Sequence, residues 1–111
     1  PTIVTRLDGL SIHALRELGD TLRSRMGDSI TVFATVENHR PTFLVMVSAP
    51  LVEKGVHAGE IAKRAAMVTG GGGGGKPTMA QAGGKDVTKL GEALAEARRV
   101  IAAALTSRVD D

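Results

Sequence analysis

The stretch SITVFATVENHRPTFLVMVSA, residues 29–49, decides the predicted fold. Side chains of a strand alternate between its two faces, and one face of the first half is entirely apolar: Ile30, Val32, Ala34 and Val36. The second half, TFLVMVSA, is apolar on both faces, which is typical of a central strand. The ENHRP segment between the halves is predicted to be a turn, so the two strands are expected to pair as a hairpin.

Three helices are predicted around this hairpin, because apolar residues recur there every three or four positions. The first helix is expected to start at a cap formed by Asp8 or Ser11 and to end at Gly27, with Arg16 away from its apolar side. The others are expected within residues 56–70 and 86–105. The three apolar stripes are, in order, Ile12, Leu15, Leu18, Leu22 and Met26; Ile61, Ala65 and Val68; and Leu90, Leu94, Ala97, Ile101 and Leu105.

Two further strands complete the predicted fold. Thr2–Leu7 is expected to be the first strand, and Met79–Ala82 a short strand at the edge of the sheet. The resulting order, β-α-β-β-α-β-α, predicts an α/β fold in which helices pack on a mixed β-sheet. The chain of 111 residues suffices for one core, so residues 1–111 are predicted to form a single globular domain. Because it begins at Pro1 rather than at a methionine, we expect a fragment of a longer protein.

The composition excludes several classes of function. The chain has no cysteine, which rules out disulfides and thiolate metal sites. No apolar run reaches the roughly 18 residues of a membrane span, so no membrane association is expected. His13, His39 and His57 are far apart in the sequence, and no set of side chains suggests a metal site or a catalytic site. The sequence pI of about 9.4 is a weak indication of nucleic-acid binding.

The most unusual feature is a run of six glycines, Gly70 to Gly75, followed by Lys76. The spacing matches the phosphate-binding loop of nucleoside triphosphatases, but Pro77 stands where a magnesium-binding hydroxyl is needed, so we reject that function. We expect a loop inside the domain. Two interpretations remain open: a flexible connector, or a backbone concavity that binds anions such as RNA phosphates. In the second interpretation the basic residues near the run add positive charge: Lys63, Arg64, Lys76 and Lys85.

The segment GGGGGKPTMAQAGGKD, residues 71–86, resembles the C-terminal glycine-rich signature of bacterial alanyl-tRNA synthetases. Residues 55–66 and 90–98 are also similar to that family, so the resemblance covers essentially the whole chain. The same type of domain is appended to phosphoesterases of the DHH superfamily, which more often have a Gly-Gly-Gly-His segment that is absent here. The resemblance therefore favours the synthetase.

This resemblance implies a non-catalytic C-terminal domain that needs no cofactor of its own. The parent enzyme, an alanine–tRNA ligase, would use ATP and Mg²⁺, act in the cytoplasm and be capable of forming a homodimer. The domain would bind the elbow of alanine-specific tRNA and help to bring the aminoacylation and editing centres together on one tRNA. The predicted RNA-binding residues are Gly71, Gly72, Gly73, Gly74, Gly75, Lys76, Gln81, Lys85, Lys63 and Arg64. The alternatives are the nucleic-acid substrate-binding domain of a DHH-superfamily phosphoesterase, and a plain interaction module that uses the final helix.

Overall fold

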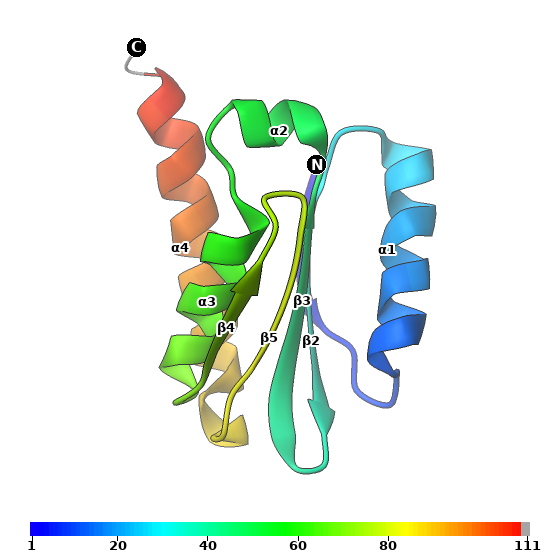
Figure 1. Cartoon of the computed structure of the whole chain (residues 1–111), viewed down its shortest axis with the longest axis vertical. Helices are drawn as coiled ribbons and strands as arrows, with labels where there is room; N and C mark the ends of the chain where they lie inside the picture. The colour runs from blue at the N-terminus through cyan, green and yellow to red at the C-terminus, as the bar shows by residue number, and fades with distance from the viewer. Residues whose placement is uncertain (110–111) are drawn as a thin grey trace.

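The computed structural model describes the backbone of residues 1–109 and the side chains of residues 1–106. Its elements follow in the order β1 (Thr2–Arg6), α1 (Ile12–Met26), β2 (Ile30–Glu37), β3 (Arg40–Val47), α2 (Ala49–Glu53), α3 (Ala58–Val68), β4 (Gly72–Gly75), β5 (Met79–Gly83), the 3₁₀ turn η1 (Val87–Lys89) and α4 (Leu90–Val109). Figure 1 shows the sheet as a central layer, with α1 on one side and α3 and α4 on the other. The predicted α/β fold with a mixed sheet is confirmed.

The five strands form one sheet in the order β1-β2-β3-β5-β4. Among the described strands, β1 and β2 run parallel, and the other neighbours are antiparallel. The predicted hairpin is formed by β2 and β3, with Glu37 opposite Arg40. Asn38 and His39 make its turn and both have positive φ angles, 51° and 65°. This is the geometry of a two-residue hairpin whose twist matches that of the strands.

Alternation along β2 and β3 divides the core into two parts. One face of the sheet packs its side chains, including Val32, Phe43 and Val45, against α3 and α4. The opposite face presents Phe33 and Leu44 to α1, whose Leu15 is fully buried between them and the rest of that cluster. Ser11 caps α1 by accepting a hydrogen bond from the Ala14 N–H, and Gly27 ends the helix, as the sequence predicts. The two-sided apolar pattern of this hairpin is thus what makes the sheet the middle layer.

Two expectations, one about the glycine run and one about the strand that follows it, are wrong. Gly72–Gly75 forms strand β4 instead of a loop, and this strand occupies the edge of the sheet. Strand β5 consequently lies inside the sheet, between β3 and β4, and is not the edge strand that was expected. The pairing of β4 with β5 uses backbone groups alone, so it leaves no apolar periodicity in the sequence. The short helix α2, which begins at Ala49 immediately after β3, was also not predicted.

Candidate nucleic-acid interface

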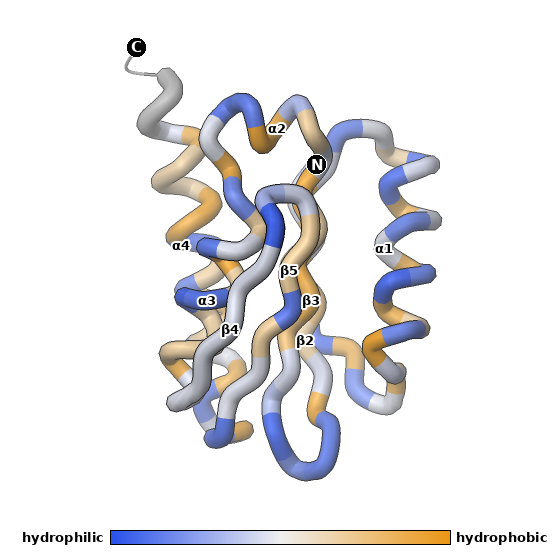
Figure 2. The backbone as a smooth tube through the Cα atoms, viewed as in Figure 1, coloured by the Kyte–Doolittle hydropathy of each residue, from blue (hydrophilic) through white to orange (hydrophobic). Residues whose placement is uncertain are grey.

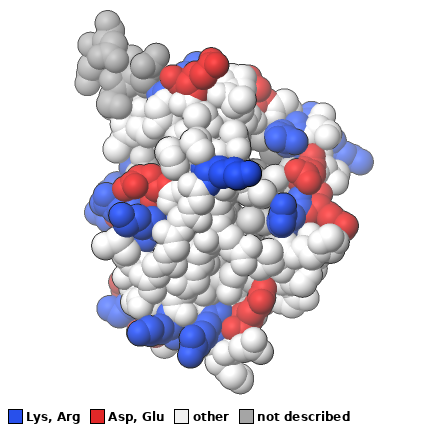
Figure 3. Space-filling view, viewed as in Figure 1, with Lys and Arg blue, Asp and Glu red and all other residues white. Residues whose placement is uncertain are grey.

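The exposed surface of β4 and β5 is the most unusual surface of the fold. In Figure 1 the two strands lie at the front, away from α1, so that one side of them is left uncovered. Figure 2 shows β4 as neutral in hydropathy, beside the strongly apolar central strands. Figure 3 shows a wide area without charged residues in the middle of this face, with Lys and Arg side chains above and below it. The exposed residues of the two strands are Gly72, Gly73, Gly75, Gln81 and Gly83. We call this surface the glycine face.

Glycine is required at some of these positions by the fold itself. Gly73 has a φ angle of 142°, and a Cβ atom placed on it would lie 2.8 Å from the Ala82 Cα atom. A Cβ atom on Gly59, at the start of α3, would lie 2.6 Å from the Gly75 carbonyl oxygen. The first turn of α3 therefore packs directly on the backbone of β4. Gly72 differs, because its φ angle is not positive and a Cβ atom there would have no other atom within 4 Å.

The backbone concavity suggested by the sequence is not formed by β4. Such anion-binding nests need successive N–H groups that point to the same side, which turn conformations provide. In an extended strand the N–H groups of neighbouring residues point in opposite directions. Here they alternate between the β5 side and the open edge of the sheet. Basic side chains at the two ends of the strands, rather than a nest, give this surface its positive charge.

Lys76 lies at one end of the glycine face, and Gln81 in the middle of β5 lines the same hollow. This hollow of about 260 Å³ lies between α1 and the strands and is also lined by Arg16, Leu44, Gly74, Gly75, Met79 and Ala80. Arg16 comes from α1, where the carboxylates nearest in sequence have other partners: Glu17 pairs with His13 at 3.1 Å, and Asp20 pairs with Arg23 at 3.9 Å. Among the described residues no carboxylate lines this hollow, so Lys76 and Arg16 face it without a neutralising partner there.

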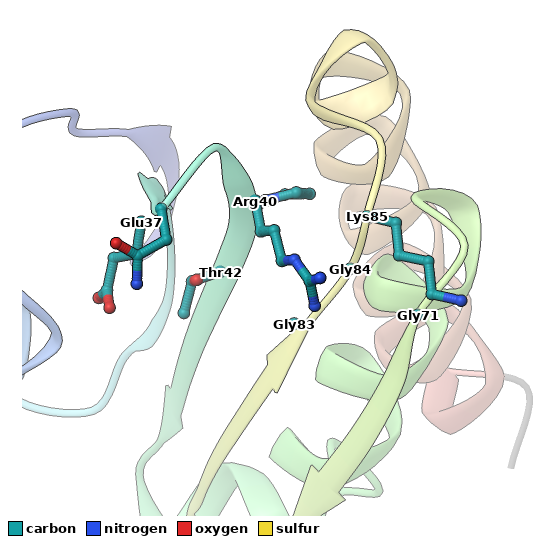
Figure 4. Close-up of a pocket in the computed structure, with 9 residues that line it drawn as sticks. Glu37, Arg40, Thr42, Gly71, Gly83, Gly84 and Lys85 are labelled. Carbon is teal, nitrogen blue, oxygen red and sulfur yellow. The ribbon is translucent and has the colours of Figure 1, made fainter.

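Lys85 marks the opposite end of the glycine face. It lines a second hollow of about 690 Å³, together with Glu37, Asn38, Arg40, Pro41, Thr42, Gly71, Gly83 and Gly84. Figure 4 shows Arg40 reaching towards Gly83 and the Lys85 side chain lying beside Gly71. The backbone here is held by Thr69, whose carbonyl accepts hydrogen bonds from the Lys85 and Asp86 N–H groups at 2.9 and 3.0 Å. The two hollows thus place cations at both ends of the glycine face.

The other two predicted residues, Lys63 and Arg64, lie on α3 and line neither hollow. Lys63 is exposed on that helix. Arg64 Nη2 lies 3.1 Å from Glu96 Oε2, and its Nη1 lies 4.0 Å from Glu60 Oε1. Glu96 is only 7% exposed and also pairs with Arg99, so this carboxylate links α3 to α4. Arg64 has a structural partner inside the fold, which the sequence did not reveal.

Sequence reasoning missed Arg16 and Arg40. Arg16 follows the buried Leu15 directly, which identifies it only as a polar residue of the first helix. Arg40 was included in the turn, but the register that pairs Thr42 with Gly83 brings the start of β3 beside Lys85. For Arg40 the one available signal was the prediction that residues 79–82 form a strand of the same sheet, because pairing of that strand with β3 would bring Arg40 near Lys85. For Arg16 there was no signal, because nothing in the sequence indicates how α1 crosses the sheet.

The pKa of Asp86 is shifted, but this residue lies outside the glycine face. The Thr88 hydroxyl and N–H both donate to Asp86, and these hydrogen bonds lower the pKa of its carboxyl group. Asp86 caps η1 and so stabilises the start of the last helix. Among the described residues, no group of three or more histidines and carboxylates is arranged to hold a metal ion. None of the helices in that part of the chain is long and apolar enough to cross a membrane.

Comparison with known families identifies the class of domain. The profile of the DHHA1 domain matches residues 1–103, so the chain belongs to the DHHA1 domain family. Its resemblance to the C-terminal domain of bacterial alanyl-tRNA synthetases is confirmed. The alanine–tRNA ligase of Acetivibrio thermocellus is 48% identical over 99 residues, which are 89% of this chain and 11% of that protein. The ligase of Dehalococcoides mccartyi strain 195 is 46% identical over 92 residues, covering 83% and 11%.

A solved structure supports the same conclusion. The C-Ala domain of the Aquifex aeolicus alanyl-tRNA synthetase superimposes with a TM-score of 0.78 at 29% sequence identity. The match covers 90% of this chain and 89% of that domain. The chain spans only about 11% of the length of the ligases that it resembles.

Proposed function

We propose that this chain is the C-terminal domain of an alanine–tRNA ligase and that it binds the elbow of tRNA through the glycine face. The observation behind the proposal is an uncharged strand surface with cations at both ends, Lys76 and Arg16 in one hollow and Lys85 in the other. The similarity to alanine–tRNA ligases supports this partner over the substrate of a DHH phosphoesterase. The parent enzyme would supply the ATP- and Mg²⁺-dependent chemistry, and this domain would help to bring its two centres together on one tRNA.

The glycine face suits a helical RNA surface. Folded RNA is recognised mainly by shape, by its phosphates and by the 2′-hydroxyl groups of its shallow groove. Without side chains, the backbone of β4 can approach these groups closely. As the edge strand, it presents N–H and C=O groups that have no strand partner on the outer side within the described part of the chain. The chain has only two aromatic residues, Phe33 and Phe43, and both are buried, which argues against a stacking platform for single strands.

The cations at the two ends of the glycine face would determine where an RNA helix lies along the strands and how tightly it binds. From Met79, which pairs with Lys76, to Gly83 at the other end of β5 the strand advances about 14 Å at roughly 3.4 Å per residue, and Lys85 follows two residues later. A short RNA helix is long enough to span this distance. One RNA helix can therefore reach both ends at once. Phosphate contacts at the two ends would orient the RNA across the neutral strands between them.

The test is a titration of tRNA with the 111-residue chain at several salt concentrations. Removal of a phosphate contact by Lys76→Ala should weaken binding and reduce the slope of log K against log salt by about 0.7–0.9. Arg25→Ala removes the same charge from an exposed site on α1 that lines neither hollow, and serves as the matched control. A loss for Arg25→Ala as large as that for Lys76→Ala would mean that only net charge matters, and the proposed site would be wrong.

A further inference from the structure

The hollow at the Lys85 end has a composition that goes beyond a simple positive patch. Its floor includes Gly71, Gly83 and Gly84, so no side chains of these residues fill it. Arg40 comes from the start of β3, and Lys85 follows the end of β5. Figure 4 shows both side chains on the same side of Thr42. The hollow therefore brings together two cations from different strands, only one of which is suggested by the glycine signature.

Neither cation has an ionic partner among the described residues. The acidic residue nearest to Lys85 in sequence, Asp86, accepts hydrogen bonds from Thr88 instead. Glu37 also lines the hollow and stands opposite Arg40 in the hairpin, but the two form no ion pair, and Figure 4 shows the Glu37 side chain beyond Thr42. An anion placed between the two cations would thus meet donors first. A planar guanidinium can bind two oxygens of one phosphate, and an ammonium group adds a second charge.

Neutral polar groups complete the hollow. Thr42 lines it from β3, and its side chain makes no hydrogen bond within the described residues. A hydroxyl group can donate to and accept from another hydroxyl, and the 2′-OH of ribose is the group that distinguishes RNA from DNA. We propose that this hollow is a ribose–phosphate site: Arg40 and Lys85 hold one phosphate of the RNA, and the Thr42 hydroxyl bonds the 2′-OH of the adjoining ribose. This inference rests on the proposed function and adds to it a means of selecting RNA over DNA.

The test compares an RNA duplex with a DNA duplex of the same sequence, each titrated with the wild-type chain and its variants. Wild type should bind the RNA more tightly. Arg40→Gln and Lys85→Gln should weaken binding of both duplexes and lower each salt slope by about 0.7–0.9. Thr42→Val, which keeps the β-branched shape, should weaken RNA binding about two- to tenfold and leave DNA binding unchanged. Thr42→Ser retains the hydroxyl and should restore the preference for RNA.

Circular dichroism and melting of each variant identify losses that come from misfolding. The inference is overturned if folded Thr42→Val keeps the wild-type preference for RNA, or if Thr42→Ser loses that preference as Thr42→Val does. It is also overturned if Arg40→Gln and Lys85→Gln behave like the control Arg25→Gln. In each of these cases, weaker RNA binding by Lys76→Gln would leave the proposed function standing. Absence of RNA binding by the wild type would refute both proposals together.

Discussion

Two neighbouring glycines of β4, Gly72 and Gly73, provide the sharpest test of the structure. The same change, glycine to alanine, should have opposite consequences at the two positions. Gly73 has a φ angle of 142°, where a residue with a Cβ atom is strained, and the added atom would lie 2.8 Å from the Ala82 Cα atom. At Gly72 the φ angle is not positive, and the added atom would meet nothing within 4 Å.

The expected magnitudes follow from these two environments. A sparsely populated backbone conformation costs about 1–3 kcal/mol, and overpacking against a fixed neighbour typically costs about 1–3 kcal/mol more. Gly73→Ala should therefore lower the free energy of unfolding by at least about 2 kcal/mol. Gly72→Ala should be neutral or stabilise the fold by up to about 1 kcal/mol, because alanine restricts the unfolded chain. At about 4 °C per kcal/mol, Gly73→Ala should melt at least about 8 °C below wild type, and Gly72→Ala should not.

Thermal unfolding followed by circular dichroism measures this difference, and urea titration gives the free energies. Equal melting temperatures for the two variants would refute the strand conformation of β4. The same pair then separates fold from function. Because Gly72→Ser should also leave the fold intact, any weakening of tRNA binding by this variant would report close approach of RNA to the strand. If Gly72→Ser binds tRNA as well as wild type, RNA does not approach Gly72 closely.

Three further outcomes are expected. Arg64→Ala should lower the free energy of unfolding by about 1 kcal/mol, less than the 3–5 kcal/mol of a fully buried pair, because Arg64 is 49% exposed and Glu96 still pairs with Arg99. In a tRNA titration this variant should lose no more affinity than Arg25→Ala. Because hydrogen bonding lowers the pKa of Asp86, its carboxylate stabilises the fold above its ordinary pKa and loses that effect as the pH falls through the lowered value; melting temperatures across the acid range should therefore depend less on pH in Asp86→Asn. The purified chain should release no phosphate from ATP with Mg²⁺, since Pro77 replaces the hydroxyl that a phosphate-binding loop needs; turnover above a no-protein blank would contradict this.

The sequence predicted those elements whose side chains follow a period. The hairpin of β2 and β3 and the helices α1, α3 and α4 bury apolar residues at regular intervals, so the sequence was sufficient to predict them. Strand β4 has no side chains and is defined by backbone pairing with β5, so periodicity could not reveal it. The edge assignment of Met79–Ala82 failed for the same reason, because the true edge strand had been interpreted as a loop.

The candidate site was predictable only where it is local in sequence. Lys76 and Lys85 flank the segment that forms β5, so their positions at its two ends follow from the chain itself. Arg16 and Arg40 reach the same face by tertiary packing, from α1 and β3. Arg64 illustrates the converse, because a residue near the glycine run in sequence can lie apart from both hollows. It is close to the glycine run in sequence, but it lies on α3 with Glu96 as its partner.

Under the proposed function, the glycines of this domain serve two physical purposes that can be distinguished position by position. At Gly73 and Gly59 a side chain would collide with the backbone of a neighbouring strand, so the fold alone accounts for glycine there. At Gly72 the fold imposes no such requirement, and a glycine inside a strand lowers stability by roughly 0.5–1 kcal/mol relative to alanine. The fold thus accepts a cost at Gly72 that packing does not explain. An exposed strand that must lie flat against a large ligand does explain it, because a Cβ atom at Gly72 would project into the contact. The open position, more than the crowded ones, is what supports a binding role for β4.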